Sequence, residues 1–239
     1  MARSKQHPCD ASPEGGRVYG RRHGRPLRPG RRDLIESLLP QLSFALPDRS
    51  LLGPATLFPD PPDEVWLEVG FGGGEHLAAQ AGSHPQTGFI GCEPFINGMA
   101  SLLAKIKKEN LANIRVFQDD ALILMSSMVE SSLDRVFILF PDPWPKKRHA
   151  KRRLIPLQTV DIMARVMKDN AELRLASDDP EYVRWMLEHL RRHEAFQWLA
   201  ERPAHWRQRT LDWSATRYET KALEAGRSCA YLRFRRRPR

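Results

Sequence analysis

The stretch Glu68-Val69-Gly70-Phe71-Gly72-Gly73-Gly74 decides the fold class, because it places a glycine-rich turn between a short apolar run and a helical pattern. The apolar run, residues 65–69, predicts a buried strand, and residues 74–81 predict a helix. Glycines at such a junction allow a sharp turn and the close approach of a ligand to the main chain. The stretch therefore predicts a ligand site at the carboxyl end of a strand in an α/β sheet.

The same alternation continues along the chain on the C-terminal side of the glycine turn. Further strands are predicted over residues 88–92, 114–117, 133–140, 173–176, 196–199 and 229–234. Helices are predicted over residues 97–109, 154–167 and 180–193, and a polar connection separates the last two strands. Strands that alternate with helices indicate βαβ units. We therefore expect an α/β, Rossmann-like, doubly wound fold, with a mostly parallel seven-stranded sheet and helices on both faces.

The spacing of the glycines distinguishes two kinds of cofactor. A dinucleotide fingerprint, G-x-G-x-x-G, requires a third glycine where this chain has Glu75. The turn E-x-G-x-G-x-G, with Glu68 two residues before Gly70, instead suits a cofactor without phosphates that carries an ammonium and a sulfonium group. S-adenosylmethionine is such a molecule. A purely structural glycine turn is the alternative.

Acidic residues follow the next two predicted strands. Glu93 ends the second strand, and Asp119 and Asp120 follow the third. In an open α/β sheet these positions face the crevice at the carboxyl ends of the strands, where Glu93 can accept hydrogen bonds from ribose hydroxyls and Asp120 from the adenine amino group. Each acid alone could be a helix N-cap or a surface group. Their place at successive strand ends favours cofactor binding.

The fourth predicted strand runs into Pro141-Asp142-Pro143-Trp144-Pro145. Two X-Pro units hold the backbone extended and stiffen the loop. An indole can stack on a base taken out of an RNA fold, and a carboxylate can accept hydrogen bonds from its amino and imino groups. This loop therefore predicts a nucleobase site, and a strand-end turn with a core tryptophan is the alternative.

Positive charge is segregated along the chain, which has 239 residues and a formal net charge of +9. Residues 1–32 carry nine Lys and Arg against two acids, and predict a basic, disordered arm before a single domain at residues 33–239, which opens with a helix over 33–46. Two further basic segments are residues 146–153 and 233–239. Segregated charge favours a polyanionic partner such as RNA, although a basic tail can also serve solubility alone.

The composition argues against four features: a membrane span, a secretory signal, a disulfide framework and a zinc site. Runs of ten apolar residues are absent from the sequence, which argues against a membrane span, and no apolar stretch follows the N-terminal arginines, which argues against a secretory signal. The cysteines, Cys9, Cys92 and Cys229, are odd in number and far apart, which argues against a disulfide framework and a zinc site. We expect a cytoplasmic protein without a metal, as a monomer or a homodimer.

Together these motifs resemble those of the bacterial tRNA (guanine-N7-)-methyltransferases, a family of class I S-adenosylmethionine-dependent methyltransferases. Residues 140–153 are similar to the family signature F-P-D-P-W-x-K-x-R-H-x-K-R-R, and residues 216–219 to T-x-[FY]-E. The resemblance covers about residues 17–235. Two departures are Asp179, where many members have Trp, and Pro145, where His is common.

The resemblance implies methyl transfer from S-adenosylmethionine to N7 of the variable-loop guanine, position 46, of tRNA. The implied cofactor contacts, with the glycines of the turn, are Glu68, Gly70, Gly72, Gly74, Glu93, Asp120 and Asp142, and Asp142 is also the implied catalytic residue. The implied substrate contacts are Lys146, Asp178, Thr216, Arg217, Tyr218 and Glu219. The basic run adds expected RNA contacts at Arg148, His149, Lys151, Arg152 and Arg153.

Neutral guanine N7 carries a lone pair and no proton, so transfer to it requires no general base. We therefore expect Asp142 to orient and neutralise the base without taking a proton. The alternatives are a non-enzymatic RNA-binding protein and a methyltransferase for an amine on DNA or RNA, whose D-P-P-[FYW] loops are loosely similar to residues 142–145. An NAD enzyme is the weakest alternative, because of Glu75.

Overall fold

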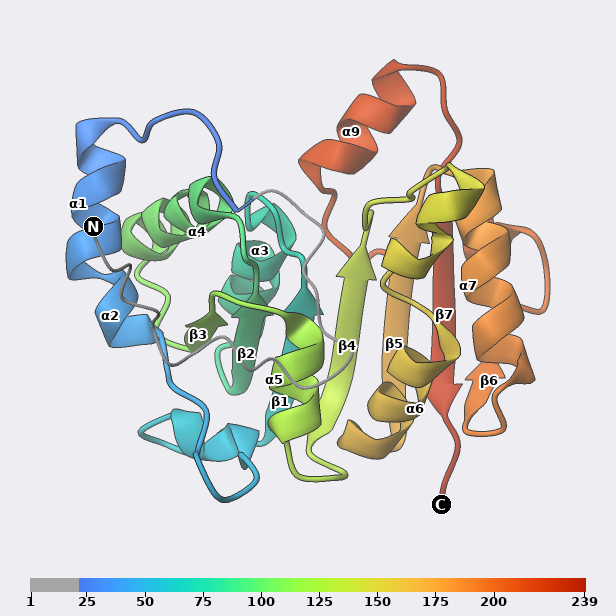
Figure 1. Ribbon diagram of the computed structural model, residues 1–239, viewed down its shortest axis with the longest axis horizontal. Helices are drawn as coiled ribbons and strands as arrows, with labels where there is room; N and C mark the ends of the chain where they lie inside the picture. The colour runs from blue at the N-terminus through green and yellow to red at the C-terminus, as the bar shows by residue number, and fades with distance from the viewer. Residues whose placement is uncertain (1–21) are drawn as a thin grey trace, which may run out of the picture.

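The computed structural model describes residues 22–239, and its centre is a seven-stranded sheet in the order β3-β2-β1-β4-β5-β7-β6 (Figure 1). The strands are β1 (Glu64–Val69), β2 (Thr87–Cys92), β3 (Ile114–Phe117), β4 (Leu133–Leu139), β5 (Met167–Ser177), β6 (Phe196–Trp198) and β7 (Ala230–Arg236). Strands β1 to β5 pair in parallel, and β7 runs antiparallel to both β5 and β6. The predicted mostly parallel, seven-stranded sheet is confirmed.

Helices cover both faces of this sheet. They are α1 (Pro29–Ser37), α2 (Leu39–Leu42), α3 (Glu75–Ser83), α4 (Ile96–Glu109), α5 (Ala121–Ser127), α6 (Leu157–Val166), α7 (Pro180–Arg192), α8 (Ala204–Arg207) and α9 (Arg217–Glu224), with 3-10 helices η1 (Pro54–Leu57) and η2 (Lys147–Arg152). One hydrophobic cluster joins α5, α6 and α7 to the sheet, and a second joins α1, α3 and α4 to the other face. Because side chains alternate along β1, Val65 and Leu67 enter the first cluster and Trp66 the second.

Helix boundaries depart from the predictions where capping residues decide them. The helix expected over residues 33–46 is instead two helices: α1 begins at Pro29, a residue suited to a first helical position, and Pro40 stands in the first turn of α2. The last residues of the predicted arm therefore belong to α1, and residues 1–21 of that arm lie outside the described residues. The predicted polar connection contains α9, which Thr216 caps.

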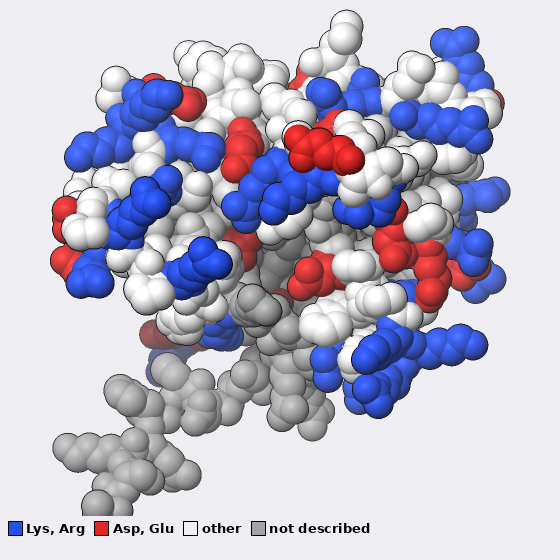
Figure 2. Space-filling model, turned by 90° about the horizontal axis from the view of Figure 1, so that it is seen from above, with Lys and Arg blue, Asp and Glu red and all other residues white. Residues whose placement is uncertain are grey.

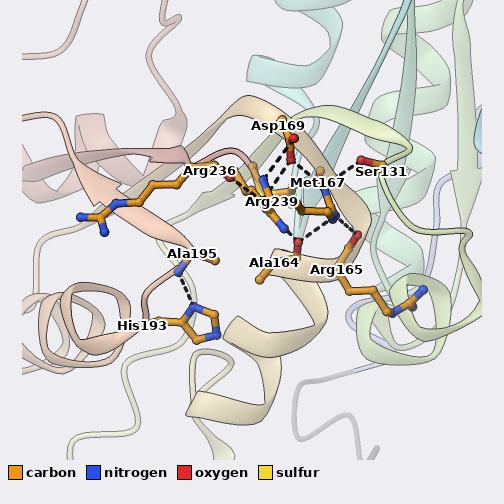
Figure 3. Close-up of polar contacts among 10 residues, drawn as sticks. Ser131, Ala164, Arg165, Met167, Asp169, His193, Ala195, Arg236 and Arg239 are labelled. Carbon is orange, nitrogen blue, oxygen red and sulfur yellow. Dashed lines mark hydrogen bonds and ion pairs between the residues drawn. The ribbon is translucent and has the colours of Figure 1, made fainter.

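The basic C-terminal segment binds the body of the protein at the amino-terminal edge of the parallel strands (Figure 3). Arg239 donates to the carbonyl oxygens of Arg165 (2.7 Å) and Met167 (3.2 Å), and Arg236 donates to that of Ala164 (3.1 Å). Both guanidinium groups also bind Asp169. These carbonyls end α6, where cations are favoured. The C-terminus lies far from the end of β1, where the glycine turn follows (Figure 1), and Arg236 and Arg239 stabilise the fold through these contacts.

Candidate active site

Two adjoining cavities open at the carboxyl ends of β1, β2 and β4. The larger, of about 500 Å³, lies between the glycine turn, the end of β2, the loop after β4 and α9. The smaller, of about 230 Å³, extends towards the start of α5 and the start of α6. Val69, Gly70, Pro94, Arg152 and Leu154 line both cavities, which therefore form one crevice. Figure 2 looks down on this edge of the sheet and shows Lys and Arg side chains gathered around it, with acidic groups between them.

The glycines of the turn share a backbone conformation, but Gly70 and Gly74 have different surroundings. Gly70 (φ +70°), Gly72 (φ +55°) and Gly74 (φ +72°) all adopt the left-handed conformation that favours glycine. A Cβ on Gly74 would lie 2.7 Å from Leu102 Cδ1, so this glycine permits the packing of α3 on α4. A Cβ on Gly70 would meet nothing within 4 Å, because Gly70 faces the open crevice. Gly70 is therefore the position at which a ligand can reach the main chain.

Gly98, which the sequence analysis did not single out, supports the turn from α4. A Cβ there would lie 2.2 Å from the carbonyl oxygen of Gly72, so only glycine lets α4 approach so closely. An isolated glycine within a helical pattern was the available signal.

Glu93 lines the larger cavity and also holds the glycine turn. Its Oε2 accepts a hydrogen bond from the Gly72 amide (2.8 Å), and its Oε1 accepts one from the Phe95 amide (3.0 Å). Burial raises the pKa of Glu93, and the two amide hydrogen bonds oppose that rise only in part. The carboxylate is thus placed at the crevice against a desolvation penalty, and two main-chain amides hold it there.

Glu68 lines neither cavity. Strand alternation places its side chain on the same face as Trp66, beneath α3, where its Oε2 lies 2.7 Å from His76 Nδ1. Both side chains are buried. The contact links the strand before the glycine turn to the helix after it, so Glu68 stabilises the turn.

Asp120 combines two roles that the sequence left as alternatives. It caps α5, with Oδ1 accepting a hydrogen bond from the Leu122 amide (2.8 Å), and it lines the smaller cavity. Burial raises its pKa, and the neighbouring Asp119 adds to the rise. Asp119 also lines this cavity and accepts from Arg22 (3.1 Å).

The loop after β4 is strained at both ends. Phe140 (φ +53°) and Trp144 (φ +45°) adopt the left-handed conformation, which for bulky residues destabilises by about 1–3 kcal/mol each and is concentrated at functional sites. The loop places Asp142 and Trp144 on the wall of the larger cavity. The guanidinium carbon of Arg152 lies 5.0 Å from the centre of the Trp144 ring, and the His149 ring meets it edge-on at 5.8 Å. A carboxylate and an indole therefore face the cavity together.

The predicted substrate residues are divided between three places. Tyr218, in the first turn of α9, lines the larger cavity, and Arg217 donates to its hydroxyl (3.2 Å). Thr216 caps α9 by accepting from the Glu219 amide (3.1 Å), and the buried Glu219 carboxylate accepts from Arg209 and Tyr231. Thr216 and Glu219 thus position α9 without lining the crevice.

Asp178 and Lys146 also lie outside the crevice. Asp178 accepts from Arg227 Nε (2.7 Å) and borders a separate cavity of about 650 Å³ beside Trp206 and Leu223. Lys146 is exposed and immediately precedes η2.

The basic segment after the loop contains groups with different surroundings. Lys146, Lys147, Arg148 and Lys151 are exposed, whereas Arg152 is half-buried and lines both cavities. Desolvation and the cations around it lower the pKa of His149. Arg153 is only 4% exposed, and its guanidinium binds groups of the protein itself. The predicted RNA contact by Arg153 is therefore not supported, because a buried guanidinium cannot reach a phosphate.

Within residues 22–239, no helix combines the length and apolarity needed to cross a membrane, and no three His, Cys, Asp or Glu side chains group as metal ligands do.

The sequence of this chain is similar to known proteins over most of its length. A family model described as "Putative methyltransferase" matches residues 62–232. A Rhodospirillum rubrum protein named tRNA (guanine-N(7)-)-methyltransferase is 50% identical over 229 residues, which cover 95% of this chain and 90% of the relative. A protein of the same name from Brucella abortus is 46% identical over 98% of this chain and 99% of its own. A third, from Nitrobacter winogradskyi, is 48% identical over 92% of this chain and 86% of its own.

Solved structures support the fold. The [4+2]-cyclase SpnF has a TM-score of 0.51 at 16% identity, covering 74% of this chain and 76% of its own. An rRNA methylase from Streptococcus thermophilus has a TM-score of 0.50 at 12% identity, covering 74% of this chain and 89% of its own. At these identities the likeness shows a shared fold alone.

Proposed function

The chain belongs to the tRNA (guanine-N7-)-methyltransferase family, and we propose that it transfers a methyl group from S-adenosylmethionine to N7 of the variable-loop guanine of tRNA. One observation carries the proposal for this crevice. The larger cavity is lined on one side by Gly70 and Glu93, which suit the cofactor, and on another by Asp142 and Trp144, which suit a base. Groups for both reactants therefore share one space.

The crevice fits the cofactor in three respects. A Cβ added to Gly70 would meet no atom within 4 Å, so there is space for a ligand against the main chain. Glu93 can accept hydrogen bonds from ribose hydroxyls in the larger cavity, and Asp120 can accept one from the adenine amino group in the smaller one. When bound, S-adenosylmethionine supplies an electrophilic methyl group on a sulfonium. We propose that Glu68 and Gly74 act on the cofactor through the shape of the turn.

The loop after β4 supplies the groups that bind the guanine. Trp144 offers a stacking surface, with Arg152 already placed over its ring. Asp142 can accept hydrogen bonds from the N1–H and the amino group of guanine, and this contact turns the opposite edge, which carries N7, away from the loop. Tyr218 closes the cavity from α9.

Asp142 orients the base and does not act as a general base. Guanine N7 has a lone pair and no proton to lose, so in-line placement of the reacting atoms is the main requirement, and such placement can contribute about 7–11 kcal/mol. Positive charge develops on the purine as the methyl group is transferred, which makes its N1–H a stronger donor. A carboxylate at that edge therefore binds the transition state more tightly than the ground state.

A pair of tRNA transcripts tests this proposal directly. The first is unmodified, and the second carries 7-deazaguanine at the variable-loop position, where carbon replaces N7 and the Watson–Crick edge is retained. We expect transfer of a tritiated methyl group to the first transcript and none to the second, with equal binding of both. Methylation of the 7-deaza transcript would point to the amine-methyltransferase alternative, and absence of transfer to either would point to an RNA-binding protein without this activity.

Substitution of Gly70 is expected to weaken cofactor binding through steric filling of the crevice. Gly70→Ala should raise the Kd for adenosylhomocysteine at least 10-fold by calorimetry, because the Cβ would project into the ligand's space. Gly226→Ala is the matched control: Gly226 has the same φ of +70° and also meets nothing within 4 Å, but lies in the turn after α9. Equal losses in the two variants would show that backbone strain alone is responsible.

Reversal of charge at the start of η2 is expected to weaken tRNA binding. Lys147→Glu with Arg148→Glu should raise the Kd for tRNA at least 10-fold at 0.1 M salt and reduce the salt dependence, because about 0.7–0.9 counterions are released per neutralised phosphate. The Kd for adenosylhomocysteine should not change. Arg235→Glu with Arg237→Glu imposes the same charge change on exposed positions at the opposite edge of the sheet. An equal loss of tRNA affinity in this control would contradict a site-directed role for residues 147 and 148.

The monomer-or-homodimer state and the cytoplasmic location stay predictions.

A further inference from the structure

Arg153 is the buried end of a basic segment in which Lys146, Lys147, Arg148 and Lys151 are exposed. Its side chain is 3% exposed, whereas that of its ion-pair partner Glu181 is 54% exposed, with Nη2 and Oε1 2.7 Å apart. A buried charge requires hydrogen-bond partners, and those of Arg153 come from two different parts of the chain.

The first set of partners belongs to the strained loop. Arg153 Nε donates to the carbonyl oxygen of Pro143 (3.0 Å), and Nη2 lies 3.4 Å from that of Trp144. Pro141, Pro143 and Pro145 have no N–H to donate, so this loop has little capacity to fix itself by its own main-chain hydrogen bonds. Arg153 thus binds the loop at the residue whose left-handed backbone aims the indole.

The second set of partners belongs to α7. The guanidinium carbon lies 5.6 Å from the ring centre of Tyr182 and 5.0 Å from that of Trp185. The following residues dock on the same two side chains: the Leu154 amide donates to the Tyr182 hydroxyl (3.1 Å), and Trp185 Nε1 donates to the Ile155 carbonyl (2.6 Å). Tyr182 is fully buried in the core, so α7 offers a rigid support.

We propose that Arg153 is a positioning residue that transmits the rigidity of α7 to the loop after β4, and so holds Asp142 and Trp144 in their catalytic placement. This inference rests on the proposed function. Arg153 borders the smaller cavity but not the larger one, so it reaches Asp142 and Trp144 through the loop carbonyls. Because a misplacement of about 1 Å can lower a rate 100-fold, loosening of this link affects the chemical step more than binding.

The test compares two buried arginines. Arg153→Lys keeps the charge but loses the planar fork, and we expect a 30- to 100-fold lower single-turnover rate at saturating tRNA. The rate is measured at saturating cofactor and expressed per adenosylhomocysteine-binding site, because Arg153 also borders the smaller cavity. Arg174→Lys is the control, because Arg174 is 2% exposed, binds Glu172 and Asp212, and packs on Phe137 and Trp213, away from the loop. It should unfold more easily but keep its rate per site.

Two further measurements test whether Arg153 acts through the loop after β4. Arg153→Lys should lower the rate by a smaller factor in a Trp144→Ala background than in the parent protein, because the part of its effect that acts through the indole is then already lost. Hydrogen exchange over residues 140–146 should be at least 10-fold faster in Arg153→Lys than in Arg174→Lys, a readout that does not depend on activity. Should the Arg153 variants not fold, Glu181→Gln, at an exposed position, is expected to lower the rate about 3-fold.

A rate per site in Arg153→Lys within 2-fold of the parent protein, or an equal loss in Arg174→Lys, would overturn the inference. So would an unchanged rate in Glu181→Gln where the Arg153 variants do not fold. If the parent protein itself transfers no methyl group to tRNA, the proposed function fails, and the exchange experiment still decides whether Arg153 fixes the loop.

Discussion

Replacement of Asp142 by Asn is expected to lower the rate of methyl transfer at saturating tRNA and cofactor by about 100- to 1,000-fold, the range found when one group that stabilises developing charge is removed. The amide keeps the size of the carboxylate but offers one oxygen and an amino group. That amino group would face the N–H groups of guanine, and the negative charge that favours a cationic purine is lost. Binding of adenosylhomocysteine should change little.

Proton transfer plays no part in this expectation. Because guanine N7 carries no proton, the solvent deuterium isotope effect on the single-turnover rate should be close to 1 in the parent protein and in Asp142→Asn. Asp161→Asn, a control on α6 where the carboxylate pairs with His193, should leave the rate unchanged. A large isotope effect that Asp142→Asn abolishes would assign Asp142 the role of a general base and contradict the mechanism.

Replacement of Glu93 by Gln is expected to raise the Kd for adenosylhomocysteine about 100-fold. Glu93 has one carboxylate oxygen for the Gly72 amide and the other for the Phe95 amide, and its side chain lies at the cavity that we assign to the ribose. A glutamine has a single acceptor oxygen, so one buried amide loses its partner, at about 1–3 kcal/mol, in addition to the lost charge on the ribose contact. Calorimetry measures the change, and Glu75→Gln, outside both cavities, is the control.

The pH dependence of cofactor binding follows from the raised pKa of Glu93. Since burial raises this pKa, the carboxylate takes up a proton at a higher pH than an exposed glutamate would. Affinity of the parent protein should therefore fall as the pH is lowered through the raised pKa, whereas Glu93→Gln should show a flatter profile. Parallel profiles in the two proteins would contradict the assignment.

Folding responds to the same proton in the opposite direction. Between the ordinary pKa of a glutamate and the raised one, the folded state binds more protons at this site than the unfolded state does. The contribution of Glu93 to the free energy of unfolding therefore falls as the pH rises through that window. Carboxylates whose pKa is shifted at the expense of folding are concentrated at functional sites, which agrees with the role that we propose for Glu93.

The sheet and the acids at its strand ends could be predicted from local pattern alone. Strands β1 to β4 are short, mostly apolar runs, and Glu93, Asp120 and Asp142 stand shortly after such runs, so all three line the crevice. Strand β5 (Met167–Ser177) is longer than the predicted residues 173–176, because its first half is polar and gave no apolar run. Glu68 differs because it stands within its strand. Because side chains alternate along a strand, Glu68 lies on the same face as Trp66, beneath α3. This alternation could have been predicted from the sequence, but the glycine motif favoured a cofactor contact instead.

Helix α9 and its residues show a second limit. Thr216 and Glu219 have the spacing of a capping box, which would have predicted a helix start here. The family motif drew attention to the same residues as substrate contacts, although within the described structure they hold α9 in place.

The sequence does not distinguish exposed arginines from arginines that bind groups of the protein itself, because the partners of the latter are distant in the chain. Arg148 and Arg153 belong to one basic run, and only the aromatic side chains of α7, about 30 residues further on, make the second one part of the interior. Likewise, Arg236 and Arg239 bind the end of α6, whose position against β7 follows from the sheet order.

Identification of the modified nucleoside tests the account most directly. After incubation with S-adenosylmethionine, an unmodified tRNA would be digested to nucleosides and analysed by mass spectrometry. Formation of 7-methylguanosine, lost when the variable-loop guanine is replaced by adenine, is the result we expect. Methyl groups found instead on an exocyclic amine or on ribose would show that the acid and indole of the β4 loop present some other atom to the cofactor.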